Sequence, residues 1–249
     1  NKIDPQTKQV VGSSQIWLQN AAFIYVPLLL IFAGLAWFVL RSVPIKASFR
    51  EQLDIFKDKH TWFCTITYLM TFGGFSGLSA VFPLLISGLY GKFPNAPDPL
   101  VYAFYGPLIG SASRVIFGFV ADKVGGAVLT QACGLAKIAI YITMFALGLF
   151  TPESIDQFPM FVGCILALFF FTGVGNAGTF RQYPIIFGAN PRQAAGVIVW
   201  TAAVAAYGPF IFSVSIGSVT SAWGNPLPFF YAITLFFAFA TAINWWYYT

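Results

Sequence analysis

The chain carries little charge and few side chains that do chemistry. Only 8% of its 249 residues are charged and it has a single histidine, whereas a soluble domain carries about 25% charged residues. Its three cysteines, Cys64, Cys133 and Cys164, are too scattered to predict a disulfide framework or a metal site. No cofactor motif appears in the sequence. We therefore expect a protein that is neither a soluble domain nor an enzyme and that uses no cofactor or metal.

The sequence also lacks the alternating segments of about ten residues that build a β-barrel. Long apolar runs dominate instead, because the chain is 58% hydrophobic and has a mean hydropathy of +0.76. A helix of about 20 apolar residues crosses a bilayer. Seven stretches are long enough, at about 21–40, 62–90, 100–120, 128–150, 158–187, 193–219 and 228–248. The sequence predicts an all-α membrane protein with seven spans.

Basic residues are distributed unevenly between the two sides of these spans. When the loop 41–60 is taken as cytoplasmic and the sides alternate, the outer side holds only Lys2, Lys8 and Lys92. The inner side holds Arg41, Lys46, Arg50, Lys57, Lys59, Lys123, Arg181 and Arg192. This excess obeys the positive-inside rule and is not a nucleic-acid signature. We expect a multi-pass protein of a bacterial-type inner membrane, with the loop 41–60 in the cytoplasm.

The order of the spans predicts how the chain is divided. Residues 1–20 form a polar outer segment, 21–40 a first helix, 41–60 a charged loop, and 61–249 a bundle of six helices. In the loop, Phe49, Leu53 and Phe56 recur at helical spacing and predict a short amphipathic helix. One helix before a central loop and six after it match the end of one six-helix bundle and a complete second bundle. We interpret the chain as part of a longer protein whose N-terminal bundle is missing here.

Arg114 lies inside the apolar segment PLVYAFYGPLIGSASRVIFGFVADKVGG, and no apolar segment offers a carboxylate that could neutralise it. A guanidinium in a bilayer is costly, so it normally faces a water-filled path or an anion. Its side chain leans toward the helix N-terminus, over Gly110 and Gly106, where missing side chains would leave a hollow. The planar fork suits nitrate, nitrite or a carboxylate. The alternatives are an arginine that snorkels to the headgroups or one that caps backbone carbonyls.

Other polar and aromatic residues are expected at the same depth. Tyr68 and Arg114 both lie roughly 10 Å from the inner end of their spans, so Tyr68 could donate to an anion and Phe72 could stack on it. Asn176 stands in a glycine-rich stretch, GVGNAGTFRQYP, which predicts a broken or closely packed helix. Gly208 and the following proline are expected to interrupt the sixth span. Lys137 also lies in a span, as a lipid-side snorkelling or a structural residue.

Several motifs resemble known families. The run YGPLIGSASRVIFGFVADKVGG resembles the helix 8–9 region of the major facilitator superfamily. The stretches IWLQNAAFIYVPLLL, KASFREQLDIFKDKHTW, YLMTFGGFSGLSAVFPLLI, GVGNAGTFRQYPIIF and AAYGPFIF are similar to the nitrate/nitrite porter family. The resemblance covers essentially the whole chain. It implies the major facilitator fold, with this chain as the C-terminal part, about helices 6–12.

The resemblance also implies roles for individual residues. Arg114 matches the family's substrate-binding arginine in helix 8, and Tyr68 and Phe72 match the aromatic pair of helix 7. Gly110 and Asn176 stay with them as candidate substrate-binding residues on the spacing argument above. Gly208 falls on a glycine of the second nitrate signature in helix 11. That motif departs from the family's pattern, with Ala205 and Pro209 in place of glycines and Ser213 in place of a proline.

The implied function is transport of nitrate and nitrite by alternating access in a lipid bilayer. We favour nitrate/nitrite exchange, because all eight carboxylates and His60 are assigned to loops or span ends and leave no proton relay. Three alternatives stay open: proton-coupled nitrate symport, a major facilitator carrier of another small anion, and a non-transporting membrane subunit of a larger complex.

Overall fold

The structure is a computed structural model that describes residues 2–3, 10–12, 19–41 and 49–249. The chain divides into two compact units, 1–47 and 48–249. In the first unit, strands β1 (Lys2–Ile3) and β2 (Val10–Gly12) pair antiparallel. Helix α1 (Gln19–Val39) follows and contains Pro27. Its apolar side chains, such as Phe38, are exposed, which suits a helix that is covered by lipid or by other helices.

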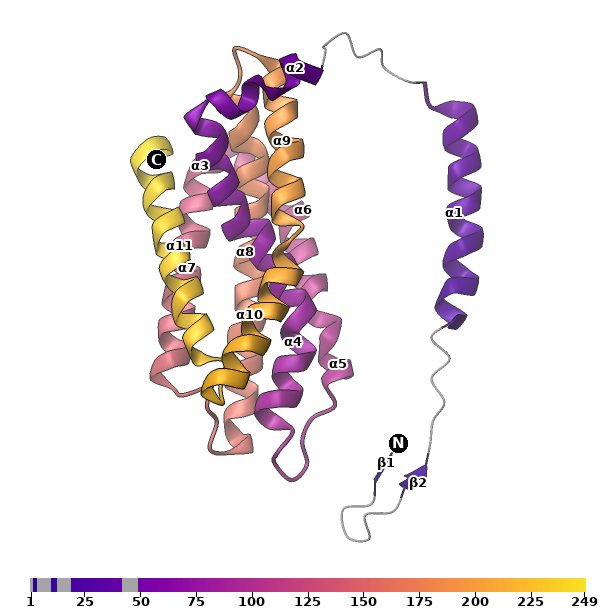
Figure 1. Cartoon of the computed structure of the whole chain (residues 1–249), viewed down its shortest axis with the longest axis vertical. Coiled ribbons are helices and arrows are strands. Elements are labelled where there is room, and N and C mark those ends of the chain that lie inside the picture. Colours follow the sequence, from indigo (N-terminus) through magenta and orange to yellow (C-terminus); the bar gives the residue numbers. More distant parts are fainter. Residues whose placement is uncertain (1, 4–9, 13–18, 42–48) are drawn as a thin grey trace. The chain divides into compact units, whose positions relative to one another are not determined.

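The second unit is helical throughout its regular structure (Figure 1). It begins with α2 (Phe49–Gln52) and the 3₁₀-helix η1 (Leu53–Lys57). The spans then contain α3 (Lys59–Tyr68), the π-helix η2 (Leu69–Gly73), α4 (Gly74–Tyr90), α5 (Pro99–Ala103), α6 (Tyr105–Val124), α7 (Gly126–Ala146), the 3₁₀-helix η3 (Ile155–Gln157), α8 (Phe158–Ile186), α9 (Pro191–Ala205), α10 (Gly208–Trp223) and α11 (Leu227–Tyr248). Within the described residues, seven helical stretches are long and apolar enough to cross a membrane. The prediction of an all-α membrane protein with seven spans is confirmed.

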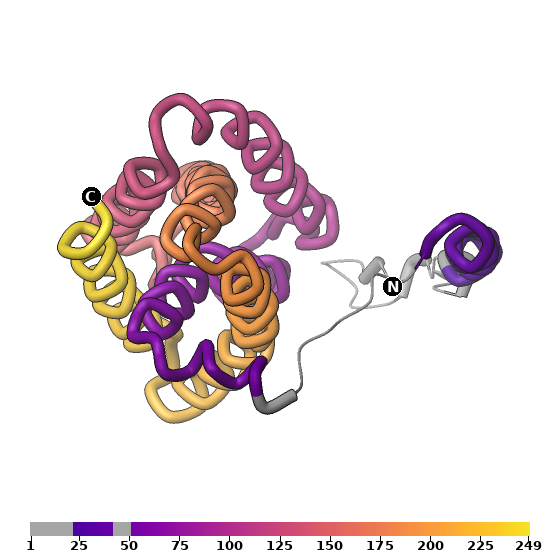
Figure 2. Tube along the Cα trace, turned by 90° about the horizontal axis from the view of Figure 1, so that it is seen from above, coloured from indigo at the N-terminus to yellow at the C-terminus, as the bar shows by residue number. Residues whose placement is uncertain are grey.

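The six spans of the second unit form one bundle, which Figure 2 shows along its helices. Helix α8 lies between α6 and α7, while α11 packs on α7 and α10 packs on α4. Buried aromatic rings such as Phe82, Phe161 and Phe237 fill the interior. Large apolar side chains such as Leu235 and Val199 face outward. Since both lipid and interior are apolar, close packing rather than water exclusion holds such helices together.

Glycines let the helices approach each other closely. A Cβ at Gly77 of α4 would collide with the ring of Phe212 on α10, and a Cβ at Gly173 of α8 would collide with the backbone of Gly110 on α6. Helix α8 is continuous from residue 158 to residue 186. Of the two expectations for the glycine-rich stretch, close packing is therefore correct and a broken helix is wrong.

Two other spans depart from regular α-helix. The sixth span of the sequence prediction is interrupted between α9 and α10 at Ala206 and Tyr207, directly before Gly208, as expected. The span that begins with α3 contains a feature that the sequence did not predict, the π turn η2 between Tyr68 and Gly74. Single π turns inside helices are rare and are often found at functional sites.

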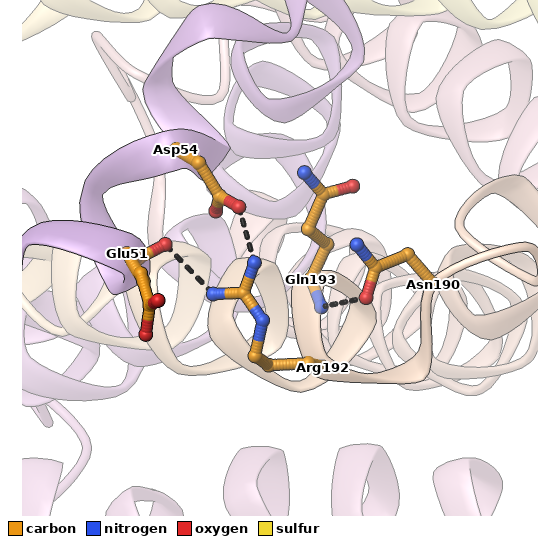
Figure 3. Close-up of polar contacts among 5 residues, drawn as sticks. All are labelled: Glu51, Asp54, Asn190, Arg192 and Gln193. Atoms are coloured by element: carbon orange, nitrogen blue, oxygen red, sulfur yellow. Dashed lines mark hydrogen bonds and ion pairs between the residues drawn. The ribbon is translucent and has the colours of Figure 1, made fainter. Parts of the chain in front are cut away.

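The segment with α2 and η1 is attached to the start of α9 by polar contacts (Figure 3). Arg192 donates to the Glu51 carbonyl over 2.7 Å and forms an ion pair with Asp54. The expected amphipathic helix is present only as the short α2 followed by η1. Ile55 is buried in this segment and Leu53 is 43% exposed, while the side chain of Phe49 lies outside what the structure describes.

His60 is not in a loop, which corrects the sequence-based assignment. The second span begins at Lys59, so His60 lies in its first turn. Its Nδ1 is 2.8 Å from the hydroxyl of Tyr248, the last residue of α11. The only histidine of the sequence therefore lies at the end of the bundle where α3 begins and α11 ends.

Candidate anion-binding site

Arg114 lies on α6 with most of its hydrogen-bonding capacity unused. Its Nη1 donates to the Oδ1 of Asn176 over 3.5 Å, which is a long and weak hydrogen bond. The two ion pairs among the described residues involve other arginines, Arg181 with Asp122 and Arg192 with Asp54. The guanidinium thus has no carboxylate partner in the part of the chain that the structure describes. It can bind an external anion without first breaking an ion pair.

A small hollow opens beside this guanidinium between η2, α4, α6 and α8. It has a volume of about 10 Å³ for the centre of a water-sized sphere, which is room for about one water molecule. Its lining residues are Phe72, Phe75, Gly110, Ser111, Arg114, Thr172, Gly173 and Asn176. One cation, one amide, two hydroxyls and two aromatic rings therefore converge on the same space. None of these six side chains can become anionic at neutral pH.

Asn176 is the buried polar residue of the hollow. Its side chain is 2% exposed, and its Nδ2 has no hydrogen-bond partner. A buried N–H group without a partner costs about 1–3 kcal/mol, so nearly all such groups in proteins are paired. An anion bound beside the Arg114 guanidinium could accept a hydrogen bond from this free Nδ2.

The aromatic pair predicted from the sequence flanks the π turn. The rings of Tyr68 and Phe72 stack with centroids 5.5 Å apart and planes 18° apart. Phe72 lines the hollow, but Tyr68 does not. Tyr68 is 3% exposed and lies next to Phe72. The expected meeting of Tyr68 and Arg114 at one level stays a prediction, and Tyr68 is not among the residues that line the hollow.

The glycines of α6 leave less space than expected. A Cβ on Gly110 would lie 2.5 Å from the Cε2 atom of Phe75, and a Cβ on Gly106 would collide with the ring of Phe169. The expectation of an empty face over both glycines is wrong at Gly106, because a ring from α8 fills it. At Gly110 the ring of Phe75 also comes close, so only the small hollow beside Arg114 stays open.

Gly208 does not join this group. It is the first residue of α10, where a Cβ would lie 2.6 Å from the Ser76 Oγ and would collide with the Gly73 carbonyl. Because Gly208 has no side chain, the start of α10 can pack directly against the end of the π turn at Gly73. Gly208 therefore touches the element that carries Phe72 and not the hollow itself.

Sequence reasoning did not name four of the lining residues as site residues, namely Phe75, Ser111, Thr172 and Gly173. Phe75 follows Phe72 by three residues, and Thr172 precedes Asn176 by four. Both spacings place residues on one helix face, so applying that rule from Phe72 and Asn176 would have found them. A larger cavity of about 650 Å³ lies elsewhere, between α4 and α10, and Lys92 is the only charged residue in its lining.

Comparison with known proteins adds a functional context. No family model matches the chain. It is 58% identical over 237 residues to a probable nitrate/nitrite antiporter, NarK2, of Thermus thermophilus, covering 95% of this chain and 52% of that protein. It is also 30% identical to the nitrate/nitrite transporter NarU of Salmonella typhimurium, over 93% of this chain and 53% of that protein. The identity to NarU of Escherichia coli is again 30%, over 92% of this chain and 52% of that protein. Nearly the whole chain is therefore similar to about half the length of each of these proteins, which are named as nitrate/nitrite antiporters or transporters.

Proposed function

We propose that this chain is the C-terminal part of a nitrate/nitrite porter of the major facilitator superfamily. In this proposal, α1 is the last helix of the N-terminal bundle and the segment with α2 and η1 belongs to the cytoplasmic central loop. The six spans from Lys59 to Tyr248 are the complete second bundle. The chain spans about half the length of the curated relatives it matches, which agrees with one bundle and one further helix.

The single observation that carries the substrate class is the unpaired guanidinium of Arg114 beside the free Nδ2 of Asn176. Two groups of N–H donors aimed at one space suit the oxygens of a planar oxyanion. Phe72 offers a flat ring for the face of such an anion, and Tyr68 can donate from the side. The weak hydrogen bond between Arg114 and Asn176 is easily replaced by an anion that bridges them.

The site is half of a transport site. The hollow holds about one water molecule, so nitrate needs additional space that opens toward the missing bundle. In a carrier of two bundles, the substrate binds near the middle of the membrane and the bundles rock around it. The π turn η2 and the break before Gly208 are the places where this bundle can bend, since both interrupt the regular ladder of helix hydrogen bonds.

Exchange is the coupling that the hollow supports best. A proton-coupled carrier usually has an ionisable group in its membrane path, and the lining residues include no carboxylate and no histidine. With exchange, nitrite or nitrate accompanies Arg114 in both directions of the cycle. The guanidinium is then never without a counter-ion while the carrier returns.

The test is nitrate uptake by the full-length protein in vesicles. Arg114→Lys keeps the positive charge but removes the planar fork of donors, so we expect uptake to fall by at least tenfold. Arg41→Lys is the matched control, because Arg41 is an exposed residue directly after α1. Folded Arg114→Lys protein with the uptake of the control would reject the site and the substrate class together.

A further inference from the structure

Lys137 of α7 points into the bundle, and the snorkelling interpretation of this lysine is wrong. Its side chain is 1% exposed. The Nζ donates to the carbonyl of Met70 over 2.5 Å and lies 3.7 Å from the centre of the Phe237 ring on α11. It takes part in neither of the ion pairs among the described residues. The lysine is therefore a buried cation that is held by a carbonyl dipole and an aromatic face.

Such a cation needs compensation, because burying an ammonium without an anion is costly. An aromatic face attracts a desolvated cation, and a hydrogen bond from a charged donor is stronger than one between neutral groups. The carbonyl concerned is not an arbitrary one. Met70 lies within the π turn η2, where the N–H of Gly74 reaches back five residues to Leu69. Lys137 thus binds the one turn of this span that departs from α-helical hydrogen bonding.

The π turn separates Lys137 from the anion-binding hollow. Phe72 lines the hollow together with Arg114. Met70 is fully buried on the other side, where its sulfur lies 3.5 Å from the Thr241 Oγ1 of α11. The same five-residue turn therefore presents one residue to the anion site and another to Lys137. Any change in the turn at Met70 is passed through two residues of backbone to Phe72.

We propose that Lys137 is a positioning residue of the anion site, which holds the π turn in the shape that places Phe72 against Arg114. The role in anion binding rests on the proposed function, whereas the effect on the turn does not. Lys137 touches neither the hollow nor any residue that would bind the substrate. Its contribution passes entirely through the backbone of η2, so removing it should change how well the anion fits and not whether the chain folds.

The first test is Lys137→Met in the full-length protein, which replaces the ammonium by an apolar side chain of similar length. We expect hydrogen exchange of the backbone amides in 69–75 to become at least fivefold faster without any substrate. We expect the KM for nitrate to rise about tenfold, with the maximal rate within twofold of wild type. Lys92→Met is the matched control, since Lys92 is exposed in an outer loop, and it should change neither quantity.

A second variant disturbs the same contact from the other side and keeps the charge. A Cβ on Gly74 would lie 2.9 Å from the Lys137 Nζ and 3.3 Å from the Phe237 ring, so Gly74→Ala must push the ammonium away from the Met70 carbonyl. Gly88→Ala is its control, because Gly88 lies in the same helix with nothing within 4 Å of an added Cβ. Gly74→Ala should reproduce both effects of Lys137→Met, and it decides the question if Lys137→Met does not fold.

The two readouts separate the two proposals. Unchanged amide exchange in 69–75 in these variants would overturn the inference, whatever happens to transport. Faster exchange with an unchanged KM would also overturn it, because the turn would then not position the anion site. Faster exchange in a protein whose wild type does not transport nitrate would confirm that Lys137 holds the turn and would reject the proposed function instead.

Discussion

Asn176→Asp is the sharpest perturbation of the anion site, because it changes charge at nearly constant shape. The new carboxylate would stand where the Asn176 Oδ1 now lies, 3.5 Å from the Nη1 of Arg114. At an effective dielectric constant of about 20, two unit charges at that distance attract by about 5 kcal/mol. Desolvating the carboxylate takes a large share of this. If about 60% of the attraction remains, an anion must displace an internal partner worth about 2.8 kcal/mol, which is a hundredfold in affinity.

The assay is concentration-dependent nitrate uptake into vesicles, measured with the thermal stability of the purified protein. We expect the KM for nitrate to rise about a hundredfold, while the unfolding temperature stays the same or rises. Stability should not fall because the substitution removes the unpartnered Nδ2 and gives Arg114 a partner. Asn95→Asp, in an exposed outer loop, adds the same charge away from the hollow and should have no effect. A stable Asn176→Asp protein with a KM within threefold of wild type would refute the assignment of Arg114 and Asn176 to one anion.

Three further substitutions test neighbouring features. Gly110→Ala places a Cβ 2.5 Å from the Cε2 atom of Phe75, and such overpacking costs about 1–3 kcal/mol, so nitrate affinity should fall about tenfold. Gly163→Ala, with nothing within 4 Å of its added Cβ, is the control. Equal affinities in the two variants would show that the Phe75 ring is not a wall of the site. Phe72→Leu removes a flat face worth about 0.5–1.5 kcal/mol, so the nitrate KM should rise threefold to tenfold, and no rise would exclude stacking. Arg192→Gln breaks an exposed ion pair worth at most about 1 kcal/mol, so the unfolding temperature should drop slightly with the KM unchanged; a tenfold change in KM would contradict a purely local role.

The spans and the principal site residues could be predicted because they depend on length, polarity and helical spacing. Seven apolar runs define seven spans whatever their packing. Arg114 stands out because charge inside an apolar run is rare, and counting residues from the span ends brings Tyr68 and Phe72 to its level. Asn176 was found as the polar residue of a glycine-rich stretch. Each of these inferences needs only one helix or two consecutive ones.

The rest depends on packing that the sequence does not encode locally. The residues from Leu69 to Gly73 are apolar or small, so nothing in their pattern distinguishes a π turn from an α-helical turn. The direction of Lys137 was undetermined because the lipid and the interior of the bundle are equally apolar, so the hydrophobic pattern does not show which face of the helix is inside. The hollow over Gly106 was expected wrongly because Phe169 fills it from a span that is distant in sequence.

The most direct test of the account is counterflow through the full-length protein in vesicles held at a fixed membrane voltage. Vesicles are loaded with nitrite or left without any internal anion substrate, and entry of labelled nitrate is followed with and without an imposed pH gradient. The account predicts that nitrate enters rapidly only when nitrite is inside, that the pH gradient has no effect, and that Arg114→Lys abolishes this entry. Nitrate entry into nitrite-free vesicles that is driven by inward protons would contradict exchange, and equal entry in the Arg114→Lys protein would contradict the anion site on which the account rests.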